Sequence, residues 1–245
     1  MRRQASSDRR AGRAGRDLCG RRLLSVRPAS VPGGYSMVTG RRASRGDYYK
    51  ALAAHLPPQA LVVTSLGNAS YLWASVHHTP GNFYFEDAMG LTLPLALGLA
   101  LAQPKRPVIA VEGDGALLMH MGALVTIGAM NPANLTILLI QNGVHAASGG
   151  QALTNATLDL AQLARAAGIA HAENLAQPQA LGKKIGQIED RRGVEMLVLA
   201  TEPDVEPIRP PVSLDPIATK QRFMAEIKAP RYVPTLFGGG RLEPE

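Results

Sequence analysis

Two uncharged apolar runs lie in the middle of the chain. Val108–Val111 and Leu135–Ile140 are rich in leucine and β-branched residues, as expected of strands that are buried on both faces of a parallel sheet. The segment between them, Ala116–Met130, is apolar and long enough for a crossover helix. The pattern therefore predicts a βαβ unit whose two strands have their carboxyl ends at the same edge of the sheet.

Further apolar runs on both sides extend this unit to a whole domain. We expect strands at Leu61–Ser65, Asn82–Phe85, Ile169–His171 and Val194–Ala200, and helices at Asp47–Leu56, Leu91–Ala102, Leu158–Ala167, Pro178–Ile188 and Ile217–Ile227. This alternation predicts an α/β fold with a doubly wound parallel sheet. The length of residues 47–230 suits a single domain of this kind.

The two ends of the chain differ from this domain in composition. Residues 1–46 hold twelve arginines and two aspartates, a net charge of +10, whereas the rest holds 14 basic and 17 acidic residues, a net charge of −3. With little apolar periodicity, the arginine-rich segment is predicted to be disordered, and residues 231–245 to form a loose tail. The arginine-rich segment has three interpretations: a transit peptide, a nucleic-acid-binding arm, or upstream sequence that precedes a true start at Met37. We favour the last.

Composition also excludes several classes of protein. Cys19, the only cysteine, lies in the arginine-rich segment, so the domain has no disulfide framework, iron–sulfur cluster or thiol nucleophile. No run approaches 18 uncharged apolar residues, so no transmembrane helix is expected. Because the excess basic charge is confined to residues 1–46, the domain itself indicates no nucleic-acid partner. We therefore expect a cytoplasmic protein.

The ends of the two central strands carry polar groups that suit a metal and a diphosphate. Gly113 and Gly115 leave the backbone bare, so that a phosphate can approach the N–H groups at the start of the next helix. Asp114 would repel that phosphate unless a cation such as Mg²⁺ stood between them. Asn142 offers an amide oxygen and Val144 a backbone carbonyl. A bare Gly-Asp-Gly is usually a tight turn, but the surrounding strands and spacing favour a metal–diphosphate clamp.

These residues carry a resemblance to a known family. Gly-Asp-Gly, 26 intervening residues and then Asn resembles the cofactor motif of thiamine diphosphate enzymes. Within them, the chain is most similar to the small 2-oxo acid decarboxylases, namely the sulfopyruvate decarboxylase β subunit and the C-terminal half of phosphonopyruvate decarboxylase. The resemblance covers Asp47–Ile227 and is carried by Ser65–Asn68, Phe83–Phe85, Met89–Gly90, Gly113–Met119, Asn134–Thr136, Asn142–Val144 and Ser148–Gln151.

The resemblance implies a set of cofactor-binding residues. Asp114 and Asn142 would bind Mg²⁺ through their side chains, and Val144 would bind it through its carbonyl. The diphosphate of thiamine diphosphate would lie against Gly113, Gly115, Ala116 and Asn142. The loop that contains Gly67 and Asn68 would line the same pocket, although an ordinary strand-to-helix turn is an equal alternative there.

The loop after the aromatic strand would hold the aminopyrimidine ring of the cofactor. In the family a backbone carbonyl accepts a hydrogen bond from the ring, and a bulky apolar side chain bends the cofactor. Asp87 and Met89 stand at these positions. The family usually has glycine where this chain has Asp87, and a side chain there restricts φ. Met89 could instead fill a gap in the core.

The segment His145–Gln151 is expected to face the substrate. His145 is its only ionisable side chain and suits proton transfer near neutral pH, although a solvent-facing histidine in a loop is the simpler alternative. Ser148 is the second catalytic candidate. Because no lysine or arginine lies between Arg106 and Arg165, we expect the positive charge for an anionic substrate to come from another chain.

The resemblance also implies a partner. Enzymes of this kind need a glutamate beside the pyrimidine ring, on a second domain for which this chain has no sheet pattern. We therefore predict the pyrophosphate-binding subunit of a heteromeric 2-oxo acid decarboxylase, with sulfopyruvate or phosphonopyruvate as substrate and a pyrimidine-binding, α-type subunit that supplies the glutamate. A carboligase subunit related to acetolactate synthases and a non-catalytic thiamine diphosphate-binding module remain alternatives.

Overall fold

The computed structural model describes residues 42–154, 158–203, 208–210 and 212–227, together with the short strands at 232–233 and 241–242. The predictions for residues 1–41, including Cys19, lie outside this part of the chain. Within it, no helix is both long and apolar enough to cross a membrane.

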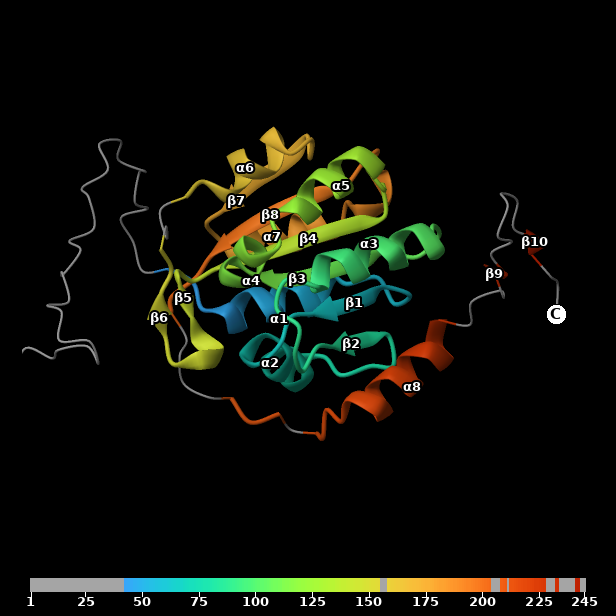
Figure 1. Cartoon of the computed structure of the whole chain (residues 1–245), viewed down its shortest axis with the longest axis horizontal. Helices are drawn as coiled ribbons and strands as arrows, with labels where there is room; N and C mark the ends of the chain where they lie inside the picture. The colour runs from blue at the N-terminus through green and yellow to red at the C-terminus, as the bar shows by residue number, and fades with distance from the viewer. Residues whose placement is uncertain are drawn as a thin grey trace, which may run out of the picture. The chain divides into compact units, whose positions relative to one another are not determined.

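The predicted parallel sheet is confirmed. Six parallel strands follow the order β2-β1-β3-β4-β8-β7, as Figure 1 shows. Their bounds are β1 Leu61–Thr64, β2 Asn82–Tyr84, β3 Val108–Gly113, β4 Leu135–Gln141, β7 His171–Leu175 and β8 Glu195–Ala200. The chain runs from β1 to β2 on one side and then returns to β3 on the other. This change of direction opens a crevice at the carboxyl ends of β1 and β3, where ligands of such sheets bind.

Helices cover both faces of the sheet. One core cluster joins the sheet to α3 (Thr92–Ala102), α5 (Gly122–Met130), α6 (Leu160–Ala166) and α8 (Pro216–Ile227). The second cluster joins the opposite face to α1 (Arg45–His55), α2 (Asn68–Val76) and α7 (Pro178–Ile185). The short helix α4 (Asp114–Met119) starts at the carboxyl end of β3. The prediction of a doubly wound fold therefore holds for helices as well as strands.

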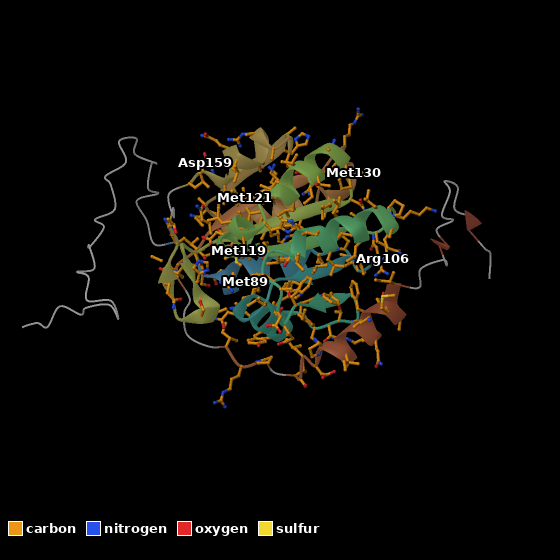
Figure 2. The ribbon with its side chains drawn as sticks, viewed as in Figure 1. Met89, Arg106, Met119, Met121, Met130 and Asp159 are labelled. Atoms are coloured by element: carbon orange, nitrogen blue, oxygen red, sulfur yellow. The ribbon has the colours of Figure 1, made fainter. Side chains whose placement is uncertain are left out.

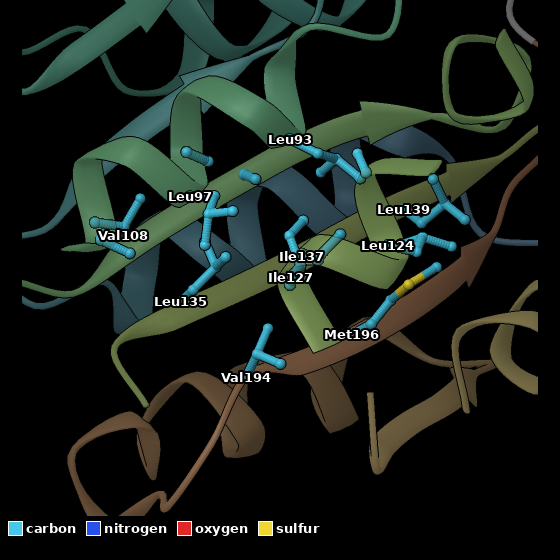
Figure 3. Close-up of a cluster of buried hydrophobic side chains, with 14 of the residues drawn as sticks. Leu93, Leu97, Val108, Leu124, Ile127, Leu135, Ile137, Leu139, Val194 and Met196 are labelled. Carbon is cyan, nitrogen blue, oxygen red and sulfur yellow. The ribbon is translucent and has the colours of Figure 1, made fainter. Parts of the chain in front are cut away.

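The pattern of the central strands explains this two-faced packing. Side chains alternate between the faces of a strand, so Val108 and Ala110 of β3 lie in the first cluster and Ile109 and Val111 in the second. All four are fully buried. Figure 3 shows the first cluster, in which Leu93 and Leu97 of α3 lie over the strands and Leu124 and Ile127 of α5 lie beside Ile137, Leu139 and Met196.

Several boundaries differ from the prediction. The expected crossover helix is divided, because His120 leaves the helical conformation and its Nδ1 lies 3.1 Å from the carbonyl oxygen of Gly90. The strand expected at Ile169–His171 lies further along the chain: α6 ends at Ala166, and β7 starts only at His171. β7 is an edge strand with exposed polar residues, so its apolar signal is weak.

The amino-terminal boundary of the domain also needs correction. Helix α1 begins at Arg45, two residues before the predicted start at Asp47; Ser44 is its N-cap, and Asp47 is the third helical residue, which completes the capping box. Ala43 forms a parallel bridge with Thr201. Residues 43–46, which the sequence assigned to a disordered segment, therefore belong to the fold.

The segment after β4 forms a small hairpin that the sequence did not reveal. β5 (Val144–His145) pairs antiparallel with β6 (Gln151–Ala152), and the 3₁₀ helix η1 (Ala146–Ser148) lies between them. A second 3₁₀ helix, η2, spans Ile188–Asp190. In the predicted loose tail, β9 (Tyr232–Val233) and β10 (Arg241–Leu242) form an antiparallel pair, and the rest of that tail lies outside the described residues.

Candidate cofactor site

A cavity of about 240 Å³ lies at the carboxyl ends of β1, β3 and β4, beneath the β5–β6 hairpin. It brings together segments that are far apart in the sequence. Most of the predicted site residues line it: Asn68, Met89, Gly113, Asp114, Gly115, Ala116, Asn142, Val144, His145 and Ser148. The edge of the sheet that the sequence indicated is therefore the place where these residues meet.

Two predicted residues, Gly67 and Asp87, do not line the cavity. Gly67 caps α2 with φ 66° and ψ −135°, a conformation that other residues rarely adopt, and a Cβ there would lie 3.2 Å from the Cβ of Ala147. The absence of a side chain at Gly67 thus allows η1 to pack against the start of α2. Asp87 is exposed, and the positive φ in its loop falls on Ala88 (66°) and Gly90 (84°) instead. The expected restriction of φ therefore applies to Ala88 rather than to Asp87.

The carboxylate of Asp114 is fixed from two sides. Asp114 is 2% exposed. The N–H of Gly115 donates to its Oδ1 (2.8 Å), and the N–H of Gly143 donates to its Oδ2 (2.8 Å). Each carboxylate oxygen has two acceptor positions, so both can also bind a cation. The contact with Gly143 ties the end of β3 to the turn that follows β4.

Burial and local charges act in opposite directions on this carboxyl group. Burial raises the pKa of Asp114, whereas the N–H groups of Gly143 and Gly115 and the positive charge of Arg45 oppose that rise. A divalent cation at the carboxylate would favour the ionised form in the same way as these groups. The site thus contains a carboxylate that is costly to ionise until a cation arrives.

Asn142 and His145 complete the wall of the cavity beyond β4. Asn142 is buried, and its Oδ1 accepts a hydrogen bond from the N–H of Val144 (3.1 Å). The ring of His145 packs against Gly115, where a Cβ would lie 2.8 Å from its Cε1 and Nδ1. Gly115 is therefore needed for this close approach, whereas a Cβ on Gly113 would meet nothing within 4 Å.

Ser148 and Asn68 make contacts that limit their freedom in the site. The Ser148 hydroxyl lies 3.1 Å from Oε1 of Gln151 and 3.4 Å from the carbonyl oxygen of His145, so it braces the hairpin. The side-chain oxygen of Asn68 accepts a hydrogen bond from the N–H of Ile208 (3.1 Å). Asn68 therefore also connects the start of α2 to the segment that precedes α8.

Known proteins resemble this chain in sequence and in fold. Residues 66–198 match the model of the thiamine pyrophosphate enzyme C-terminal TPP-binding domain. The chain belongs to this family. The sulfopyruvate decarboxylase subunit beta of Methanococcus maripaludis is 32% identical over 185 residues, which make up 76% of this chain and 98% of that protein.

Two further similarities are partial. Phosphonopyruvate decarboxylase of Streptomyces viridochromogenes is 41% identical over 132 residues, but these cover 53% of this chain and only 33% of that protein. The solved structure of benzoylformate decarboxylase from Polynucleobacter necessarius superimposes with a TM-score of 0.59 at 18% identity, over 72% of this chain and 36% of that one. That superposition supports the thiamine pyrophosphate-binding fold.

The donor atoms in the cavity suit a thiamine pyrophosphate-binding domain. Asp114, Asn142 and Val144 line the cavity and can offer carboxylate, amide and backbone carbonyl oxygens, the ligands that Mg²⁺ prefers. A Cβ on Gly113 would meet nothing within 4 Å, so there is open space beside its backbone for a diphosphate. The residues present therefore fit a magnesium ion together with a diphosphate.

Two polar residues of this region were missed by the sequence analysis. Arg45 lies in the lining of the cavity and is 6% exposed. It was assigned to the disordered segment, although the capping box formed by Ser44 and Asp47 marks the start of a helix at this point. Glu112, just before Gly113, is fully buried. Its side chain lies on the same face of β3 as Val108 and Ala110, which belong to the first core cluster. The alternation along β3 was therefore a signal in the sequence that Glu112 is buried.

Burial raises the pKa of the Glu112 carboxyl above its ordinary value of 4.5, while contacts with Ser65, Gly113 and Thr92 oppose that rise. The N–H of Gly113 donates to Oε1 of Glu112 (3.0 Å). Between the ordinary pKa and the raised one, the folded protein holds a proton that the unfolded chain has lost. The free energy of unfolding must therefore fall as the pH rises through this interval.

Glu112→Gln removes this titration while keeping a polar side chain of similar size. We expect the variant to be at least as stable as the wild type at about pH 7 and to lose part of the decline in stability that the wild type shows as the pH rises above the ordinary carboxyl pKa. Urea unfolding with a chelator present measures both. Asp87→Asn, which neutralises an exposed carboxylate nearby, is the control and should keep the wild-type decline. An unchanged decline in Glu112→Gln would show that Glu112 ionises normally in the fold.

Proposed function

We propose that the chain is the thiamine diphosphate- and Mg²⁺-binding subunit of a heteromeric 2-oxo acid decarboxylase. The observation that carries the proposal is the buried carboxylate of Asp114, held between Gly115 and Gly143 at the carboxyl edge of the sheet. Membership of the thiamine pyrophosphate enzyme family supports it. The similarity to a complete sulfopyruvate decarboxylase subunit beta supports the reaction class.

In this proposal the protein binds and orients the cofactor, and the cofactor, when bound, supplies the chemistry that releases carbon dioxide from a 2-oxo acid. Asp114 and Asn142 hold the metal through their side chains, and Val144 holds it through its carbonyl. Gly113, Gly115 and Ala116 contact the diphosphate, next to Asn68 and Gly67. Met89 supports the cofactor from the loop in which Asp87 offers a backbone carbonyl.

His145 and Ser148 are the proposed substrate-facing residues. His145 is half-buried against Gly115 at the border of the cavity, so its imidazole can exchange a proton with a ligand while one side stays accessible. Ser148 is exposed on η1 and keeps a hydroxyl that can donate to an anionic substrate group. Both lie on the hairpin, which can adjust without disturbing the sheet.

A partner subunit completes the site in this proposal. The cavity of about 240 Å³ is smaller than the roughly 300–1,000 Å³ of most ligand clefts, which suits a site that a second chain closes. Beside Met89 lies an uncharged surface, here called the α4–α5 surface, that consists of Leu91, Met119, Met121 and Val125. These side chains are between 42% and 64% exposed, and Figure 2 shows Met89, Met119 and Met121 close together.

The α4–α5 surface is continuous with the cofactor site. His120, between Met119 and Met121, contacts the carbonyl of Gly90, so the surface and the loop that contains Met89 are linked. A subunit that brings a glutamate to the pyrimidine ring must lie against that loop. We therefore propose that the pyrimidine-binding subunit covers the α4–α5 surface, since clustered exposed apolar residues indicate interaction sites.

Met119→Asp tests this interface. A charge at the centre of a buried apolar contact should weaken association with a co-expressed pyrimidine-binding subunit by about tenfold or more, because the carboxylate loses its water without gaining a partner. Analytical ultracentrifugation measures the association. Met224→Asp, on the far helix α8 and 56% exposed in the wild type, is the matched control. Equal association of wild type and Met119→Asp would place the interface elsewhere.

Asp114→Ala tests the cofactor clamp. The wild-type chain, assembled with its partner, should bind thiamine diphosphate only when a divalent cation is present, because the cation separates two groups of negative charge. The variant should lose this binding in isothermal titration calorimetry, since it lacks the only carboxylate among the described residues that line the cavity. Binding that survives either the substitution or a chelator would overturn the assignment.

The substrate is tested by the reaction itself. We propose that the assembled pair releases carbon dioxide from sulfopyruvate or phosphonopyruvate in preference to pyruvate. His145→Ala should lower turnover by about 10²- to 10⁴-fold if the imidazole transfers a proton, with little change in cofactor affinity. Equal rates with pyruvate would remove the preference for a second anionic group. Acetolactate as the main product would favour the carboligase alternative instead.

A further inference from the structure

The cavity contains a cationic side chain that the motif of the family does not include. Among the described residues that line it, Arg45 is the only one with a permanent positive charge, and Asp114 is the only carboxylate. Arg45 is 6% exposed. We propose that the guanidinium of Arg45 binds an oxygen of the cofactor's diphosphate group.

The fold holds Arg45 firmly at this edge of the sheet. Ser44 and Asp47 form a reciprocal capping box, in which the N–H of Asp47 donates to Oγ of Ser44 (3.1 Å) and the N–H of Ser44 donates to Oδ2 of Asp47 (3.3 Å). Just before it, Ala43 bridges Thr201, and the N–H of Thr201 donates to the carbonyl of Gln141 at the end of β4 (3.1 Å). The start of α1 is therefore anchored to the same strand ends that form the cavity.

The body of α1 adds to this anchoring. Tyr48, Tyr49 and Leu52 are each at most 1% exposed and pack in the second core cluster. The hydroxyl of Tyr48 donates to the carbonyl of Leu175 (3.0 Å). Arg45 is thus carried by a rigid helix, so little conformational entropy is lost when its guanidinium binds a ligand.

The charges in the proposed site require a cation of this kind. A diphosphate ester carries more negative charge than one divalent cation neutralises, and Asp114 adds a further negative charge. Backbone N–H groups supply only partial positive charge. A guanidinium supplies a full charge and two parallel donors that match phosphate oxygens. With Arg45 in place, the chain provides this charge itself; the sequence analysis assigned only the positive charge for an anionic substrate to another chain.

A second role must be separated from this one. The positive charge of Arg45 also opposes the rise in the pKa of Asp114. The alternative role is that Arg45 acts only by keeping that carboxylate ionised for the metal. In that case a higher pH would restore cofactor binding to a variant without the charge. Direct contact with the diphosphate predicts instead that the loss persists at higher pH, because the missing donors are not replaced.

The experiment measures the Kd for thiamine diphosphate at saturating Mg²⁺, using the full chain assembled with its partner. Arg45→Gln should weaken binding by about ten- to a hundred-fold, the effect of losing a hydrogen bond to a charged group, at about pH 7 and equally at about pH 8.5. Arg45→Lys keeps the charge but loses the paired donors, and should be weakened by less. Arg42→Gln removes an exposed charge outside the cavity and should bind like the wild type.

Thermal unfolding without ligand shows whether each variant is folded. If Arg45→Gln does not fold, Arg45→Lys still tests the inference. Wild-type affinity in the Arg45 variants, or recovery of Arg45→Gln at the higher pH, would overturn the inference. The inference rests on the proposed function, and the two fail in different ways. A wild-type chain that does not bind thiamine diphosphate contradicts the function, whereas normal binding that ignores Arg45 contradicts only the role of this residue.

Discussion

The cost of burying one carboxylate governs the design of this site. Asp114 lies at the start of α4, almost without contact with water, and two backbone N–H groups fix its oxygens. These groups only partly compensate the loss of hydration, and the pKa of Asp114 stays raised. A bound cation lowers that cost directly. The protein therefore presents a preformed carboxylate, and in the proposed function a metal would stabilise its ionised form.

The rest of the fold serves to place that carboxylate. β3 is apolar from Val108 to Val111 and β4 from Ile137 to Ile140, and the alternation of these side chains packs both helical layers. Polar residues appear where these strands leave the sheet, and Gly115 beside Asp114 lets His145 of the hairpin approach closely. The chain builds one side of a cavity in this way. The uncharged α4–α5 surface beside Met89 suits a second subunit as the other side.

Much of this arrangement was predictable from the sequence because its signals are local. Long uncharged runs identified the central strands, and the spacing from Asp114 to Asn142 identified the two strand ends that form the cavity. The edge strand β7 was misplaced because His171 and Asn174 are exposed and Glu173 is half-buried, so polar residues interrupt its apolar run. The β5–β6 hairpin was missed because its residues are small and have no clear period. Gly67 was expected to touch the ligand, yet its backbone conformation serves the packing of η1.

The position of Arg45 could not be inferred from composition. Arg45 belongs to residues 1–46, whose twelve arginines predicted disorder throughout the segment. Only the short capping box marks the point at which the fold begins. Contact between Arg45 and the cavity depends on the bridge from Ala43 to the end of β8, which is a long-range pairing. Pairings of this kind bring together residues without any local pattern in common. The charge balance of the site therefore became visible only in three dimensions.

A crystal structure with Mn²⁺ in place of Mg²⁺ and with thiamine diphosphate tests the central claim most directly. The anomalous signal of the metal locates it independently of the surrounding protein. The account predicts a single strong peak in the cavity, within coordination distance of the Asp114 carboxylate, the Asn142 amide oxygen and the Val144 carbonyl. A metal and diphosphate bound elsewhere on the chain, or a metal in the cavity without contact to Asp114, would contradict it.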